Sequence, residues 1–169
     1  MEIGLTDEVG KMCGLRSLPA PGEGGDPFFC WDMARVYLGS RKLLIMANAA
    51  MSACAVTRMA AADWKHIDEV ARQLVEDAVE YCGCSPEEYF SLAGEIKLAK
   101  THGWRAVGNM MTTAHALWAD ENDMTEKLQW CQMEELNHHF ISRCVAYDGY
   151  GYPAERFAED LAARLARRS

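Results

Sequence analysis

The stretch WDMARVYLGSRKLLIMANAAMSACAVTR, residues 31–58, decides the fold of this chain. It holds three segments rich in aromatic and branched side chains, joined by links too short to contain a helix. Its pattern predicts strands over Trp31–Leu38, Arg41–Asn48 and Ser52–Arg58. Gly39-Ser40 is a two-residue link of the kind that closes a tight hairpin, with Tyr37 or Leu38 across from Arg41 or Lys42. Such short links favour an antiparallel meander.

The middle strand of this meander is apolar on both sides, through the run Leu43-Leu44-Ile45-Met46. A strand that faces water on one side alternates apolar and polar residues. The run therefore predicts a sheet that is covered on both faces at this strand.

Outward from the meander, alternating residues predict two more strands, over Glu2–Thr6 and Glu95–Thr101. Helices are predicted where apolar residues recur at three-and-four spacing: from about 62 to 80, 86 to 93, 104 to 118, 124 to 147 and 153 to 167. Glycine and proline cluster over residues 17–27 and predict a mobile surface loop. The expected fold is α+β, a mostly antiparallel four- to five-stranded sheet with helices packed on it, in a single domain over residues 1–169.

The charge balance limits the partners of the chain. Its 17 basic and 25 acidic residues give a net charge of −8, which argues against a general nucleic-acid binder. No apolar run approaches the roughly 20 residues that span a bilayer, and the start MEIGLTDEVGKM lacks the basic and apolar regions of a secretory signal. We expect a cytoplasmic protein with no membrane association.

The cysteine pattern favours reduced thiols. There are seven cysteines, so at least one cannot pair within the chain, and none form a Cys-x-x-Cys zinc knuckle. Cys82-Gly83-Cys84 is the only close pair, and without further ligands nearby it favours ordinary thiols over a redox or metal clip. A catalytic Cys–His pair that is distant in sequence stays open, but no pattern selects one.

The segment GEIKLAKTHGWRAVGNM, residues 94–110, is the candidate binding segment. Lys100 and Thr101 end the predicted strand, and Arg105 and Asn109 share a face of the helix that follows, at i and i+4. The first turn of a helix presents unsatisfied N–H groups, so these four residues predict a site for a phosphate or a carboxylate. In the alternative, Thr101 only caps the helix while Lys100 and Arg105 pair with acids such as Glu95.

One further motif has the spacing of a metal site. Glu135 and His138 stand at i and i+3, as in helical di-iron sites. Those sites need the motif twice, and the chain has no second Glu-x-x-His. The pattern favours a solvated helix face, and we expect no metal and no other cofactor.

The chain resembles a family of uncharacterised bacterial domains, some of them carried on plasmids. The resemblance covers roughly residues 1–157 and includes a late Tyr152-Pro153. It is carried by the following residues: Phe29-Cys30-Trp31, Arg41-Lys42 with Asn48, and Lys100-Thr101 followed by Arg105, Gly108, Asn109 and Met110. The order Asn109-Met110 is the reverse of the family pattern, and the spacing before Arg105 is one residue longer. The resemblance implies a shared site at Lys100, Thr101, Arg105 and Asn109, and no established activity.

Two functional hypotheses follow. The first is a non-enzymatic binding or regulatory module that engages a partner protein or an anionic small ligand near Lys100. The second is an enzyme acting on a phosphorylated or carboxylated substrate, with Lys100 and Arg105 as electrostatic stabilisers and Glu95 or a histidine as the base. A pocket lined by these side chains favours ligand binding or catalysis, whereas a flat apolar surface favours a protein partner.

Overall fold

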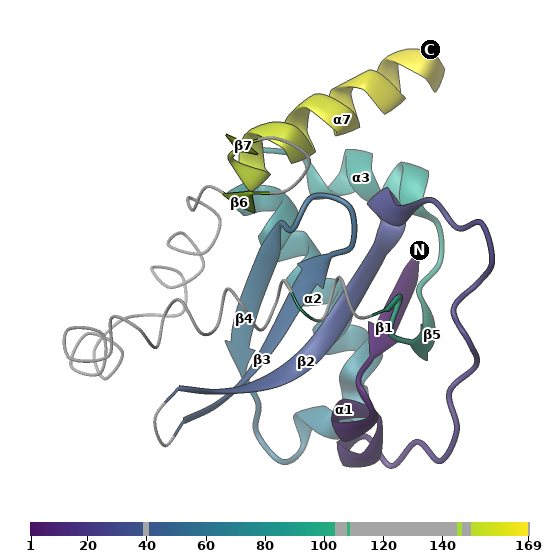
Figure 1. Ribbon diagram of the computed structural model, residues 1–169, viewed down its shortest axis with the longest axis vertical. Coiled ribbons are helices and arrows are strands. Elements are labelled where there is room, and N and C mark those ends of the chain that lie inside the picture. The colour runs from purple at the N-terminus through teal and green to yellow at the C-terminus, as the bar shows by residue number, and fades with distance from the viewer. Residues whose placement is uncertain (39–40, 104–107, 109–144, 147–149, 169) are drawn as a thin grey trace.

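The computed structural model describes residues 1–38, 41–103, 108, 145–146 and 150–168. At its centre is a five-stranded sheet in the order β4-β3-β2-β1-β5 (Figure 1). The strands are β1 (Glu2–Leu5), β2 (Cys30–Leu38), β3 (Arg41–Asn48), β4 (Cys54–Arg58) and β5 (Lys97–Lys100). The α+β class expected from the sequence is confirmed.

The meander that dominates the sequence is present as expected. β2 and β3 pair antiparallel, with Tyr37 opposite Lys42 and Leu38 opposite Arg41, so the chain reverses tightly after β2. Gly39 and Ser40 themselves lie outside the described residues. β4 pairs antiparallel with β3 along its whole length.

β1 adds parallel pairing to the antiparallel meander. It lies between β2 and β5 and is parallel to both, with Gly4 opposite Asp32 on one side and Ala99 on the other. The sheet is therefore mixed, and the expectation of a mostly antiparallel sheet is wrong. The reason is the length of the connection: α1 (Asp7–Met12) and the long segment after it bring the chain back to the end of the sheet where β1 began, which a short hairpin link cannot do.

One face of the sheet packs on helices. α2 (Ile67–Tyr81) lies behind β3 and β4 and is followed by α3 (Pro86–Ala93) (Figure 1). A 3₁₀ turn, η2 (Asp63–His66), precedes α2, so the α-helix begins later than its apolar pattern predicted. The sheet residues in this core are almost fully buried: Ile3, Leu5, Trp31, Met33, Leu44 and Met46.

An aromatic cluster joins the C-terminal helix to this core. α7 (Pro153–Arg168) buries Phe157, whose ring centroid lies 4.8 Å from that of Phe28 and 5.5 Å from that of Tyr89. The Trp31 Nε1–H donates to Tyr89 Oη at 2.8 Å, and the Tyr89 hydroxyl donates to the carbonyl of Phe28 at 3.0 Å. The 3₁₀ turn η1 (Pro27–Phe29) supplies Phe28. The predicted C-terminal helix is confirmed, and it belongs to the same core as the sheet.

β3 is buried on both faces, as its apolar run predicted. Leu43, Leu44, Ile45 and Met46 are each at most 3% exposed. The face opposite α2 also carries Cys30, Asp32 and Glu2, since side chains alternate along each strand.

Other helical expectations lie partly outside the described residues. The predicted helix over 104–118 falls outside apart from Gly108, as does most of that over 124–147. The predicted helix over 124–147 is wrong at its C-terminal end, where β6 (Val145–Ala146) pairs antiparallel with β7 (Tyr150–Gly151). The β-branched and aromatic residues there favour extended chain. Within the described chain, no helix combines the length and apolar content needed to cross a bilayer.

Candidate functional site

Lys100 is the described residue from which the candidate site can be built. It ends β5 with an exposed side chain, and its backbone N–H donates to the carbonyl of Pro19 at 2.9 Å. This bond ties the end of β5 to the segment that follows α1. Arg105 and Asn109, the other half of the predicted site, lie outside the described residues.

A cleft of about 320 Å³ opens beside Lys100. It is formed where α1, the segment after it and the end of β5 meet. Its lining residues are Asp7, Gly10, Lys11, Leu15, Arg16, Ser17, Leu18 and Lys100.

Local sequence explains why these side chains converge. Thr6 caps α1 by accepting a hydrogen bond from the N–H of Val9 at 3.5 Å, and the helix ends before Gly14, whose φ of 72° is the left-handed conformation that glycine adopts readily. The chain then turns back, and the N–H of Leu15 donates to the carbonyl of Gly10 at 3.0 Å. This turn places Arg16 and Ser17 on the same cleft as Lys11.

The described lining of the cleft is electropositive. Lys11, Arg16 and Lys100 are exposed cations, and Asp7 is the one acid among these lining residues. An anion near such cations is attracted by roughly 1–4 kcal/mol per charge pair at 4 Å near a protein surface, an interaction that salt screens. Leu15 and Leu18 add a half-buried apolar wall. The cleft can hold a small anion that carries an apolar group.

Thr101 has a packing role in the described structure. Gly4 has no side chain, and a Cβ built on it would stand 2.8 Å from the Cα of Thr101 and 2.1 Å from Asp32 Oδ1. The chain after β5 can therefore lie close over β1 only because residue 4 is glycine.

A second polar cluster, centred on the buried Asp32, follows directly. His102 Nδ1 lies 3.1 Å from Asp32 Oδ1, and His102 Nε2 lies 2.7 Å from Glu2 Oε1. The backbone N–H of His102 donates to the same Asp32 oxygen at 2.9 Å. Asp32 is completely buried, and its Oδ2 has no hydrogen-bond partner among the residues that the structure describes. We call Glu2, Asp32 and His102 the histidine cluster.

The histidine cluster holds a charged imidazole. Burial by itself lowers the pKa of His102. Hydrogen bonds and charges from Asp32 and Cys30 outweigh this effect and raise the pKa from 6.5 to about 10. His102 is therefore an imidazolium at neutral pH, with a carboxylate at each ring nitrogen. In this state it cannot accept a proton, so it does not serve as a general base there.

Sequence inspection missed this cluster. The signal was Asp32, an acid in an otherwise apolar predicted strand, because a buried carboxylate needs a partner. Its partner is His102, whose other ring nitrogen contacts Glu2, and only the parallel pairing of β1 with both neighbours brings the three residues together.

The other residues singled out in the sequence have plainer roles or are not described. Asn48 is buried and organises the turn after β3: its amide donates to the carbonyl of Phe28, and its Oδ1 accepts from the N–H groups of Ala50 and Met51 at 3.0 Å each. Glu135 and His138 lie outside the described residues, and within those residues no group of three or more potential ligands could hold a metal ion. The described cysteines are all free thiols: Cys13, Cys30, Cys54, Cys82 and Cys84.

Residues 2–156 match the family described as Domain of unknown function (DUF6933), so the chain belongs to that family. The match agrees with the extent of the resemblance found in the sequence and includes the strands, the cleft and the histidine cluster. No curated protein shows significant similarity to the chain.

Proposed function

We propose that this protein is a non-enzymatic binding module for a small anionic ligand, held in the cleft at the end of β5. The observation that carries the proposal is the convergence of Lys11, Arg16 and Lys100 around a cavity of about 320 Å³. Phosphate and carboxylate groups are the natural partners of such cations. We also expect Arg105 to contribute from the segment that follows, in a cytoplasmic bacterial protein as its sequence suggests.

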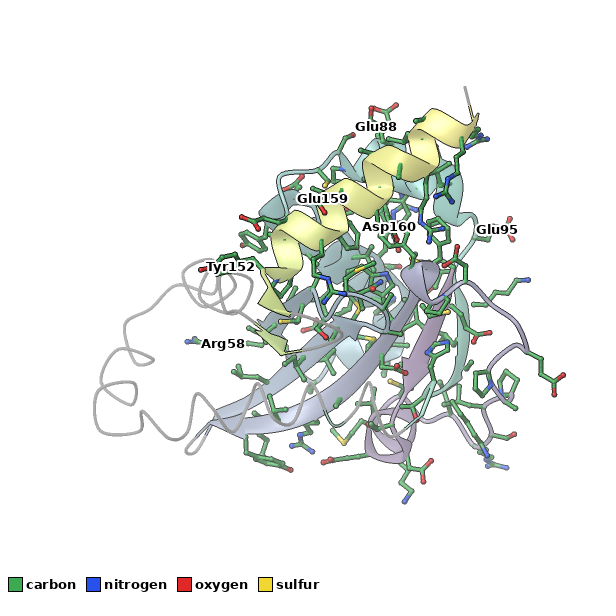
Figure 2. The ribbon with its side chains drawn as sticks, turned by 45° about the horizontal axis from the view of Figure 1, so that its top comes forward. Arg58, Glu88, Glu95, Tyr152, Glu159 and Asp160 are labelled. Carbon is green, nitrogen blue, oxygen red and sulfur yellow. The ribbon has the colours of Figure 1, made fainter. Side chains whose placement is uncertain are left out.

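The residues of the cleft favour binding over catalysis. Its described lining holds no histidine or cysteine, and among those lining residues the one hydroxyl, that of Ser17, makes no hydrogen bond with the one carboxylate, that of Asp7. Glu95, the base considered in the enzyme hypothesis, is five residues before Lys100, about 16 Å away along extended chain. In Figure 2 Glu95 lies at the end of the molecule near α3 and α7, away from α1.

A partner protein is the second candidate, and one exposed patch favours it. Met12 and Tyr37 are 42% and 41% exposed, and Arg35 lies between them, 4.0 Å from Met12 Sδ and 5.1 Å from the Tyr37 ring centroid. Aromatic and arginine side chains are enriched at protein interfaces. The patch is small, so the anion-binding proposal is favoured.

The test is calorimetric titration of the full chain with phenyl phosphate and with inorganic phosphate. We expect saturable binding that weakens with salt, and a loss of roughly 10- to 100-fold in affinity for Arg16→Ala and for Lys100→Ala, the effect of one charge-assisted hydrogen bond. Lys42→Ala is the matched control, because this exposed lysine lies on β3 outside the described lining of the cleft. Equal weakening by all three substitutions, or no binding, contradicts the proposal.

A further inference from the structure

The three cations of the cleft come from three separate parts of the fold. Lys11 lies in the last turn of α1, Arg16 lies in the segment that follows this helix, and Lys100 ends β5. The hydrogen bond from the Lys100 N–H to the carbonyl of Pro19 holds the end of β5 against that segment. The cations therefore reach one cleft from three different elements rather than from one helix face.

This arrangement fits an anion that has three terminal oxygens. Lysine and arginine side chains only donate hydrogen bonds, so each of the three cations needs an acceptor on the ligand. A phosphate monoester has three strong acceptor oxygens, whereas a carboxylate has two. The hydroxyl of Ser17 lies on the same lining and can donate to the phosphate as well.

The charge of the lining favours the same ligand. Its described residues include three cations and one acid, Asp7, which gives a net charge of +2. A phosphate monoester carries a charge close to −2 at neutral pH, because its second pKa is about 6. A carboxylate or a sulfate ester carries −1, and Coulomb attraction to the lining is proportional to the ligand charge. A dianion would match the charge of the described lining, whereas a monoanion would leave half of it unmatched.

The size of the cleft limits the rest of the ligand. Its volume of about 320 Å³ lies at the small end of the range for small-molecule sites, roughly 300–1,000 Å³. One side of the wall is fixed, because Leu18 Cδ1 stands only 3.3 Å from where a Cβ on Gly10 would be and so packs closely on α1. The cleft has room for a phosphate and a small organic group against Leu15 and Leu18.

We propose that the cleft binds a small phosphate monoester in its dianionic form, in preference to carboxylates and other monoanions. This inference rests on the function proposed for the cleft and names the class of ligand. Lys11, Arg16 and Lys100 each bind one terminal oxygen of the phosphate. Asp7 repels the ligand and keeps its affinity lower than the cations alone would give.

The test compares phenyl phosphate with phenyl sulfate by calorimetric titration of the full chain at low salt and pH 7.5. The two ligands share the ring and the three terminal oxygens, and they differ by one unit of charge. We expect phenyl phosphate to bind about tenfold more tightly, the effect of one further charge about 6 Å from a net charge of +2 in water. Equal affinities overturn this inference and leave the anion-binding function standing, whereas no binding of either ligand overturns both.

A second titration at pH 5 changes the charge of one ligand only. Phenyl phosphate is then mostly a monoanion, because its second pKa is about 6, and its affinity should fall to near that of phenyl sulfate. Phenyl sulfate is a monoanion at both pH values, so any change in its affinity reports protonation of the protein. A tenfold preference for phenyl phosphate that persists at pH 5 overturns the selection by charge.

One substitution should strengthen binding. Asp7→Asn removes the acid from the described lining, and we expect a gain of about tenfold in affinity for phenyl phosphate and about threefold for phenyl sulfate, again for charges about 6 Å apart in water. Asp68→Asn is the matched control, because Asp68 is an exposed acid in the first turn of α2, as Asp7 is in α1, and lies outside the described lining. The control should leave both affinities unchanged. Equal gains for the two ligands in Asp7→Asn, or the same gain in both variants, overturn the proposal.

Discussion

Lys100 and His102 are two residues apart in the chain, yet their charges lie in opposite surroundings. The Lys100 ammonium is exposed at a cleft among other cations, where water and salt screen it. His102 is 13% exposed and lies between the carboxylates of Glu2 and Asp32. The described lining of the cleft holds three cations and one acid, whereas in the histidine cluster two carboxylates contact one cation.

Because of this difference, we expect the cleft to serve ligand binding and the histidine cluster to serve stability. Exposed charges contribute little to folding, about 0–1 kcal/mol for a paired surface charge, and remain available to a ligand. Breaking a buried charge pair leaves an uncompensated charge and costs more. The histidine cluster should therefore hold β1, β2 and the end of β5 together, while the cationic cleft should tolerate substitution.

The largest effect is expected for Asp32→Asn. The change removes the buried negative charge that faces His102, and we expect a loss of about 3 kcal/mol in the free energy of unfolding. This is at the low end for a broken buried pair, because Asp32 Oδ2 has no partner within the described part of the chain. Urea denaturation measures it. Glu76→Gln is the control: Glu76 pairs with the exposed Arg72 on the surface of α2, and its loss should cost less than about 1 kcal/mol. Equal costs for the two variants would remove the contrast between the regions.

Next in size is Gly4→Ala. The added Cβ would meet Asp32 Oδ1 at 2.1 Å and the backbone of Thr101 at 2.8 Å, so the chain over β1 must shift. We expect destabilisation of about 2 kcal/mol, within the range for overpacking. The same denaturation experiment checks it, with Gly25→Ala as a control whose Cβ meets only ordinary contacts. A neutral Gly4→Ala would show that the close approach is not needed.

The free energy of unfolding should depend on pH through His102. The pKa of His102 is raised to about 10 from 6.5, so the folded protein binds the proton more tightly than the unfolded chain. Its stabilisation is fully present below pH 6.5 and is lost as pH rises toward 10. The free energy of unfolding should fall by at most about 1.4 kcal/mol per pH unit in this window. His102→Asn should flatten the decline, and an equally steep decline in that variant would contradict the assignment.

The smallest effect on stability is expected in the cleft. Arg16→Ala and Lys100→Ala should each change the free energy of unfolding by no more than about 0.5 kcal/mol, because both side chains are exposed. Thermal and urea denaturation check this alongside the phosphate titration. A loss in stability as large as that of Asp32→Asn would show that the cations are structural.

Local sequence patterns were sufficient for much of the fold. The meander, its tight reversal after Leu38 and the double-sided burial of Leu43–Met46 follow from apolar periodicity and short links. The helix that begins at Pro86 follows from its Ser85 cap and ends before Gly94, whose φ is 69°. These features depend on neighbours within a few residues, so the sequence alone determined them.

The tertiary structure decided what depends on distant pairing. The parallel placement of β1 between β2 and β5 is not encoded in any local pattern, because a long connection permits either direction. That placement puts Glu2, Asp32 and His102 within hydrogen-bonding distance, and it brings Lys100 beside the turn that follows α1. Sequence named Lys100 as a candidate but gave no sign of Lys11 or Arg16. Residues far apart in the chain share a site only where the register of the strands brings them together.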